Sequence, residues 1–294
     1  MFQAPASKKN DSSRYASRLF SPSPLAGEGW GEGAGAASKS APRTRSKDLT
    51  MQRATPRTLR ILGIDLAWGE RMSDGVCALV VNSHAARVLH IDLVRGDAAL
   101  LDWIRTQSGT NAALLAVDGP VICRNLTGTR PVDRLTHTHF GRYKAGCHPV
   151  NLTRCARPPR VAEAAQALGF QTGWDFAQAR RLIVEVYPHP AMVRLFDLPE
   201  RIRYKKGPVA ERRIEFRRLQ RLLIECLRVH FPRFQMDAAT LALLRAGWTK
   251  PIEDRTDALM CALIGYWHWL HRGAQTQVLG DLASGFLLVP QPGE

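Results

Sequence analysis

The sequence has no CxxC pair among its six cysteines, which are Cys77, Cys123, Cys147, Cys155, Cys226 and Cys261. Their spacing therefore matches no standard zinc-ligand pattern. A partial zinc site formed by Cys123, Cys147, His148 and Cys155 is one alternative. Several cysteines lie in apolar stretches, however, where a free thiol behaves as a small core residue. Reduced cysteines in a cytoplasmic protein are the simpler interpretation.

Long hydrophobic runs are also missing. The longest apolar helix that we expect, from Asp257 to Leu270, is too short to span a bilayer and carries His268 and two tryptophans. The N-terminus has no continuous apolar stretch after its charged residues, which argues against a secretory signal. We therefore expect no membrane partner, and nothing in the sequence indicates an oligomeric state.

Acidic residues are scarce relative to basic ones. The 294 residues include 41 Lys and Arg against 26 Asp and Glu, which gives a formal net charge of +15. Nearly half of this excess falls in residues 1–60, which hold 11 basic and 4 acidic residues. A moderately basic remainder is compatible with a nucleic-acid partner but does not require one.

Residues 1–58 are rich in Ser, Ala, Gly, Pro and Arg and have little periodic apolar pattern. Such a composition predicts a disordered tail, because too little apolar surface is available to offset the entropy of ordering. Met51 stands just ahead of the first predicted strand and is an alternative start, which would leave the first 50 residues untranslated. We expect one domain over residues 59–294, with an insert at about 123–180.

From residue 59 onward, apolar periodicity predicts strands joined by helices. The expected strands are Leu59–Leu66, Val76–Val81, Ala86–Leu93, Ala112–Val117 and Leu182–Tyr187. The expected helices are Asp97–Gln107, Val161–Leu168, Glu211–His230 and Asp254–His271, with an irregular region over residues 123–160 and a closing hairpin of Val278–Leu279 with Phe286–Val289. Short connections make the first three strands an antiparallel meander. Right-handed crossovers then give a mixed α/β sheet of order 3-2-1-4-5 with helices on both faces.

Several acidic residues stand at positions that this predicted topology would bring close together in space. Asp65 and Asp118 each end an apolar strand, and Glu185 lies inside one. Asp254 and Asp257 stand one turn apart at the start of the last helix. A carboxylate at the end of a core strand is costly unless it is paired, so the repeated pattern indicates carboxylates gathered around a divalent cation. Oxygen ligands of this kind suit Mg²⁺ or Mn²⁺.

The motifs Gly63-Ile64-Asp65, Val117-Asp118-Gly119-Pro120, Glu185-Val186-Tyr187-Pro188-His189-Pro190 and Asp254-Arg255-Thr256-Asp257-Ala258 occur in this order along the chain. Together they resemble the domain-of-unknown-function 429 family, whose members are predicted RNase H-like nucleases. The resemblance extends from about residue 60 to the C-terminus, and the helix start is also similar to the last acidic motif of Holliday-junction resolvases.

The resemblance implies an RNase H-like fold and a nuclease that uses two Mg²⁺ or Mn²⁺ ions. Asp65, Asp118, Glu185 and Asp257 would be the catalytic carboxylates, and Asp254 a further metal ligand. Two such ions would activate a water and stabilise the leaving oxygen of a phosphodiester.

Each of these residues also has a purely structural interpretation. Asp65 and Asp118 would be turn residues at strand ends, Glu185 would pair with Arg180 or Arg181, and Asp254 and Asp257 would cap a helix. His189, between two prolines, is either a proton shuttle or a turn residue.

Basic residues are the candidates for substrate binding. Lys205 and Lys206 precede a helix whose arginines include Arg213 and Arg217, and Arg130 lies in the expected insert. A basic face beside carboxylates would hold a phosphate backbone, whereas a solvated helix face is the plainer explanation.

Three other functional classes are open. A non-catalytic nucleic-acid-binding module would gain nothing from carboxylates near phosphates. Actin-like kinases share the Gly-Ile-Asp strand, but they need two domains and glycine-rich phosphate loops. A structural role predicts that alanine substitutions of the acidic residues are harmless or stabilising.

Overall fold

The protein is described here from a computed structural model, which describes residues 58–293. The predictions for the N-terminal tail and the alternative start at Met51 lie outside these residues. The strands are β1 (Leu59–Asp65), β2 (Ser73–Val81), β3 (Ala86–Arg95), β4 (Ala112–Asp118), β5 (Gln171–Thr172), β6 (Arg181–Val186), β7 (Phe234–Gln235), β8 (Thr276–Asp281) and β9 (Gly285–Pro290). The helices are α1 (Asp97–Ser108), α2 (Pro131–Phe140), α3 (Leu152–Cys155), α4 (Arg157–Gln166), α5 (Pro188–Leu195), α6 (Val209–His230), α7 (Ala238–Leu243) and α8 (Lys250–Leu270), with a 3₁₀ turn at Gly141–Tyr143.

All the described strands join one mixed sheet, so the predicted α/β class is confirmed. Its order is β7-β3-β2-β1-β4-β6-β9-β8, and β5 pairs with β6 off this path. This differs from the predicted order of five strands, because short strands and the C-terminal hairpin extend the sheet at both edges. Strands β5 and β7 have only two residues each, too few to leave a periodic pattern in the sequence.

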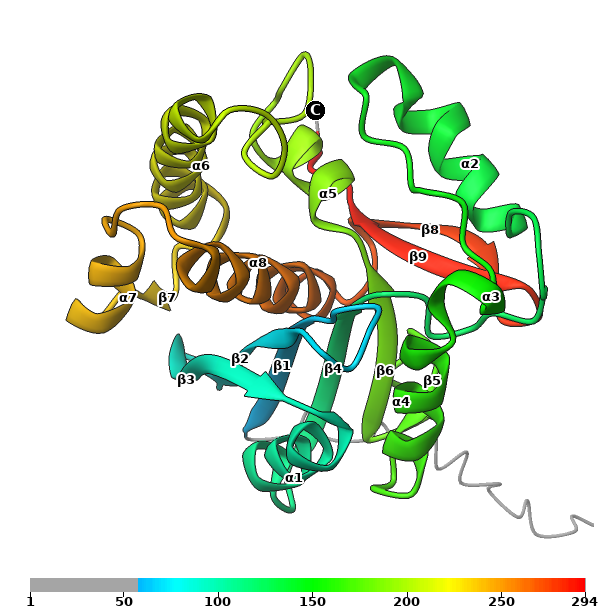
Figure 1. The fold of residues 1–294 in the computed structure, drawn as a ribbon. Coiled ribbons are helices and arrows are strands. Elements are labelled where there is room, and N and C mark those ends of the chain that lie inside the picture. The colour runs from blue at the N-terminus through cyan, green and yellow to red at the C-terminus, as the bar shows by residue number, and fades with distance from the viewer. Residues whose placement is uncertain (1–57, 294) are drawn as a thin grey trace, which may run out of the picture. The chain divides into compact units, whose positions relative to one another are not determined.

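The centre of the sheet is buried on both faces. Strands β1 and β4 run parallel, and each is a nearly continuous apolar run, as expected of strands covered on both sides. Helix α8 lies across one face, and α1 lies on the other (Figure 1). Small residues bring α8 close to the sheet: a Cβ on Gly265 would lie 3.1 Å from Ile61 Cγ2 and 3.2 Å from Ala116 Cβ.

The segment predicted to be irregular, residues 123–160, contains α2, α3 and the start of α4. Helix α2 has Pro131 in its first turn, a favourable position because no intrahelical N–H is lost there. The N-cap residue is Arg130, whose side chain accepts no hydrogen bond; instead Asp133 Oδ2 accepts from the Arg130 backbone N–H at 3.2 Å, and the Arg130 guanidinium donates to Asp133 Oδ1. The expectation failed because Arg is not a usual N-cap residue.

Two other boundaries were predicted incorrectly. Helix α8 begins at Lys250, four residues earlier than expected, and its N-cap is Thr249, whose hydroxyl accepts from the Ile252 N–H. His189 was considered as a turn residue but lies in α5, which begins at Pro188. Within residues 58–293, no helix has both the length and the apolar character needed to cross a membrane.

Candidate carboxylate site

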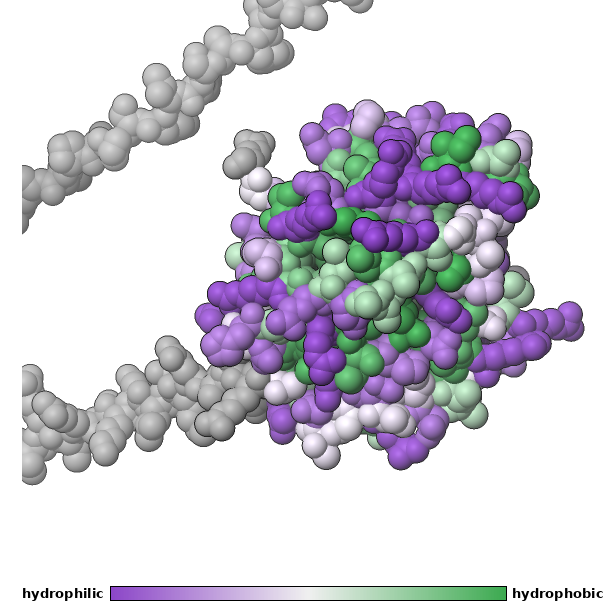
Figure 2. Space-filling model, turned by 90° about the vertical axis from the view of Figure 1, so that its left-hand side faces the viewer, coloured by the Kyte–Doolittle hydropathy of each residue, from purple (hydrophilic) through white to green (hydrophobic). Residues whose placement is uncertain are grey.

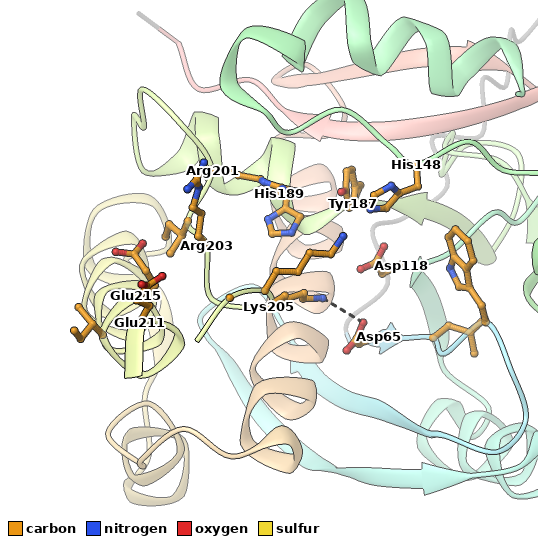
Figure 3. A pocket seen from close by; sticks show the side chains of 16 residues that line it. Asp65, Asp118, His148, Tyr187, His189, Arg201, Arg203, Lys205, Glu211 and Glu215 are labelled. Atoms are coloured by element: carbon orange, nitrogen blue, oxygen red, sulfur yellow. Dashed lines mark ion pairs between the residues drawn. The ribbon is translucent and has the colours of Figure 1, made fainter. Parts of the chain in front are cut away.

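Asp65 and Asp118 lie side by side at the carboxyl ends of β1 and β4. They are register partners in the parallel pairing of these strands, so their side chains extend to the same face of the sheet. The predicted neighbourhood of these two residues is therefore confirmed. Both line a pocket with a volume of about 680 Å³ (Figure 3). In the described residues, neither carboxylate accepts a hydrogen bond, which leaves the turn-capping interpretation without support.

Asp257 reaches the same place from helix α8, but its carboxylate is already occupied. Its side chain is fully buried. The Tyr204 hydroxyl donates to Asp257 Oδ1 at 2.6 Å, and Lys205 Nζ lies 2.9 Å from Oδ2. Lys205 Nζ is also 4.0 Å from Asp65 Oδ1, the contact drawn in Figure 3. An ammonium group therefore stands between two of the predicted metal ligands.

Burial and charge repulsion shift the pKa values of these groups in the same direction. Burial raises the pKa of Asp65 and, more strongly, that of Asp118, and neighbouring carboxylates add to the shift. Burial likewise raises the pKa of Asp257 to about 6, although Lys205 opposes this rise. Burial alone would lower the pKa of Lys205, but Asp257 and Asp65 outweigh it and hold that pKa well above its usual value. The site therefore favours a bound positive charge.

Asp254 lies one turn before Asp257, as predicted, but it pairs with a different cation. Lys250 Nζ is 2.6 Å from Asp254 Oδ1 and 2.8 Å from Glu253 Oε1. Because α8 begins at Lys250, Asp254 is inside the helix and does not cap it. The structure thus gives Asp254 a lysine partner in place of the predicted metal.

Glu185 is not in register with Asp65 and Asp118, although it lines a smaller cavity together with Asp118. Its register partner on β4 is Val117, whereas Asp118 is aligned with Val186. Successive residues of a strand point to opposite faces, so Glu185 and Asp118 leave the sheet on different faces. Both nevertheless line a smaller cavity beside the pocket, and the charge of Glu185 adds to the effect of burial in raising the pKa of Asp118.

The carboxylate of Glu185 instead forms a buried ion pair. Arg130 donates to Oε1 at 2.6 Å and to Oε2 at 2.9 Å, and the Val121 N–H donates to Oε2 at 3.1 Å. A structural partner was among the expectations, but it was expected to be Arg180 or Arg181. Because Arg130 precedes Glu185 by 55 residues, sequence proximity could not identify it.

The pocket wall carries basic, acidic and aromatic side chains. Lys205 and Lys206 line it, as predicted for substrate binding, but Arg213 and Arg217 do not. Helix α6 turns Glu211, Ile214 and Glu215 toward the pocket and leaves those two arginines exposed. In Figure 2, which shows the side of the molecule where α6 and α7 lie, hydrophilic residues are spread over much of the surface. Arg130 lines only a smaller adjoining cavity, with Glu185.

Several lining residues were missed by the sequence analysis. They are Trp68, His148, Tyr187, Arg201, Ile202 and Arg203. The only feature in the sequence that these residues share is that each follows a strand or lies in a loop, where binding residues often occur. His189 also lines the pocket; it is almost fully buried, and its Nδ1 has no hydrogen-bond partner among the described residues. Burial and the nearby Lys205 lower its pKa well below the usual value, so the ring is neutral.

Within residues 58–293, no group of three His, Cys, Asp or Glu side chains is arranged to hold a metal ion. For the acidic residues the cause is visible, because Lys205 and Lys250 occupy the carboxylates of Asp257 and Asp254. The alternative zinc site from Cys123, Cys147, His148 and Cys155 likewise does not form there.

The fold and the site define a mixed α/β protein with carboxylates at the ends of its central parallel strands and a lysine set between them. The family model described as "Protein of unknown function (DUF429)" matches residues 63–282. The chain belongs to this family. No curated protein and no solved structure matches it.

Proposed function

We propose that this protein is a divalent-metal-dependent hydrolase that cleaves phosphodiester bonds of nucleic acids at Asp65 and Asp118. The observation that carries this proposal is the pairing of these two residues in register in a pocket that Arg201, Arg203, Lys205 and Lys206 also line. The antiparallel β1–β2–β3 unit followed by parallel β4 and β6, with acids ending β1 and β4, also supports the RNase H-like assignment.

The residues present fit a hard divalent cation. Asp65 and Asp118 offer carboxylate oxygens that accept no hydrogen bond from the described residues, and oxygen is the ligand atom that Mg²⁺ and Mn²⁺ prefer. A cation there would also offset the burial and the smaller repulsion that together raise the pKa values of these carboxylates. When bound, such an ion would activate a water and stabilise charge on a phosphoryl oxygen.

The protein's own residues supply the remaining requirements for binding. Arg201, Arg203 and Lys206 line one wall and present positive charge to a phosphate group. Trp68 is 38% exposed at the pocket and offers a ring on which an unpaired base can stack. Burial and nearby cations lower the pKa of His189, so the ring is neutral and one of its nitrogens keeps a lone pair that can accept a hydrogen bond from the substrate.

The pocket volume of about 680 Å³ is within the range of small-molecule sites, about 300–1,000 Å³. A pocket of this size accommodates a nucleotide or the unpaired end of a strand, which are the substrates that we propose.

The test is cleavage of labelled single-stranded DNA and RNA, matched duplexes and nucleotides by the full chain in Mn²⁺ and in Mg²⁺. Asp118→Asn should abolish cleavage. The control is Asp102→Asn, because Asp102 is exposed on α1 and its recorded ion pair is with Arg105. Cleavage that survives in Asp118→Asn, or that needs no added metal after chelation, would contradict the proposal.

A second function, binding of a phosphate-containing ligand without cleavage, is favoured by one observation. Lys205 already neutralises Asp257, and Arg201, Arg203 and Lys206 would bind an anion without a metal. This function predicts single-strand or nucleotide binding that is unaffected by chelation, together with no cleavage of any substrate in the panel.

A further inference from the structure

Lys205 holds a fixed position in the carboxylate site. Two residues that precede it, Ile202 and Tyr204, are only 1% and 0% exposed. These buried side chains anchor the segment that carries Lys205. The Tyr204 ring packs against Phe216 and His189, at centroid distances of 6.1 and 5.8 Å, and its hydroxyl holds Asp257. The backbone that carries the ammonium group is therefore fixed by the core.

Both oxygens of Asp257 have neighbours from this segment. Oδ1 accepts a hydrogen bond from the Tyr204 hydroxyl. Oδ2 forms an ion pair with Lys205, whose Nζ lies 2.9 Å away, but the two atoms are not aligned for a hydrogen bond. A metal bound to Asp257 would have to take the place of the ammonium group, because two cations at one carboxylate oxygen repel each other. Asp257 is thus already supplied with a cation from within the chain.

The charges of the site lead to the same conclusion. Asp65, Asp118 and Asp257 contribute three negative charges when ionised, and Lys205 contributes one positive charge. Two negative charges remain, which one divalent ion neutralises and two such ions would exceed. Asp254 lies outside this set, because its ion pair is with Lys250, which it shares with Glu253.

Asp118 is the carboxylate left without a cation. Among the described residues it forms no ion pair, whereas Asp65 has only the 4.0 Å contact with Lys205. These two side chains are adjacent in register and face the pocket.

From these contacts we infer that Lys205 takes the place of one of the two metal ions expected for such a site, so that the centre binds a single divalent ion through Asp65 and Asp118. This inference rests on the proposed function and narrows it, because it replaces the two-metal arrangement implied by the family resemblance. Lys205 acts as a positioning residue, which holds Asp257 and sets the metal stoichiometry.

The test counts the Mn²⁺ ions bound per full-length chain, by calorimetry and by electron paramagnetic resonance of free Mn²⁺. The wild-type protein should bind one ion. Lys205→Met, which removes the charge but keeps an unbranched side chain of similar length, one atom shorter, should bind a second ion at the released Asp257. The matched control is Lys206→Met, because Lys206 also lines the pocket but forms no recorded ion pair with the carboxylates, and it should bind one ion.

Asp257→Asn provides an independent variant if Lys205→Met fails to fold by circular dichroism. A single-ion site at Asp65 and Asp118 should still bind one Mn²⁺ ion in Asp257→Asn. A stoichiometry that falls in this variant would overturn the inference, and so would two ions in the wild type or one ion at unchanged affinity in folded Lys205→Met.

The inference and the proposed function fail in different ways. Two Mn²⁺ ions in the wild type, together with metal-dependent cleavage, would remove only the inference. The absence of Mn²⁺ binding by the folded wild-type protein would remove both.

Discussion

Gly63 of β1 and Ala262 of α8 meet backbone to backbone. A Cβ on Gly63 would lie 2.3 Å from the Ala262 nitrogen and equally close to the Ala258 carbonyl oxygen. No side chain separates the helix from the strand at this point, two residues before Asp65. Asp257 lies on the same helix. The close contact between the two main chains therefore fixes the distance between Asp257 and the ends of the strands.

Gly63→Ala should destabilise the protein by about 3 kcal/mol or more, because the added methyl group meets backbone that cannot rotate away. Urea unfolding measures the effect. Gly69→Ala is the control, since a Cβ at Gly69 meets nothing within 4 Å and its backbone is not in the left-handed region. Equal stabilities for the two variants would show that α8 does not pack closely on β1.

Arg130→Met should lower the free energy of unfolding by about 3–5 kcal/mol, because it leaves Glu185 and Asp133 buried without their cation. Glu185→Gln should also destabilise the fold but leave Mn²⁺ binding unchanged, since the Glu185 carboxylate is held by Arg130 and is not in register with Asp118. Calorimetric titration of the folded Glu185→Gln variant decides between the two roles of Glu185. Loss of Mn²⁺ binding would restore Glu185 as a metal ligand.

Lowering the pH should destabilise the protein through His189. Burial, with the nearby Lys205, lowers the pKa of the folded-state imidazole well below 6.5, whereas the unfolded chain takes up a proton near that pH. The unfolded state then binds more protons, so this contribution to stability is complete above about pH 6.5 and is lost as the pH falls further.

The measurement is urea unfolding at pH 7.5 and 5.5. His189→Gln should lose less stability between these values than the wild type, because it lacks the titrating ring. The control is His84→Gln, since His84 is exposed between β2 and β3, and this variant should keep the wild-type profile. Identical pH dependence in all three proteins would refute the prediction.

Arg201→Ala should weaken the binding of a labelled single-stranded oligonucleotide by about tenfold, or ~1.4 kcal/mol, because Arg201 faces the pocket. Arg217→Ala should bind like the wild type, since Arg217 is exposed on α6 and does not line the pocket. Fluorescence anisotropy in Ca²⁺, at one fixed salt concentration, compares the two variants. A larger loss with Arg217→Ala would move the binding surface to α6.

The sequence predicted the part of the site that strand order determines. Asp65 and Asp118 end consecutive parallel strands, and a right-handed crossover places such ends next to each other. Asp257 was also predicted to reach this place, because the last long apolar helix must cover the sheet.

The sequence did not predict the partners of the carboxylates. Tyr204 and Lys205 precede Asp257 by more than 50 residues and lie in an irregular segment, so no periodicity relates them. The partner of Glu185 was missed for a related reason, because Arg130 precedes Glu185 by 55 residues. Contacts between distant loops depend on tertiary packing, which local pattern does not determine.

The floor and the wall of the pocket differ in how freely they can change. The carboxylates stand on central strands and on a helix held to them through main-chain contact, so a substitution there disturbs the core. The wall segment from Arg201 to Lys206 alternates exposed or partly exposed positions with the buried anchors Ile202 and Tyr204. Positions 201, 203 and 206 can therefore vary without unfolding the protein. Proteins of this family can therefore differ in ligand preference through these positions while they keep the same arrangement of carboxylates. A mutant library designed to alter specificity should begin with the same three positions.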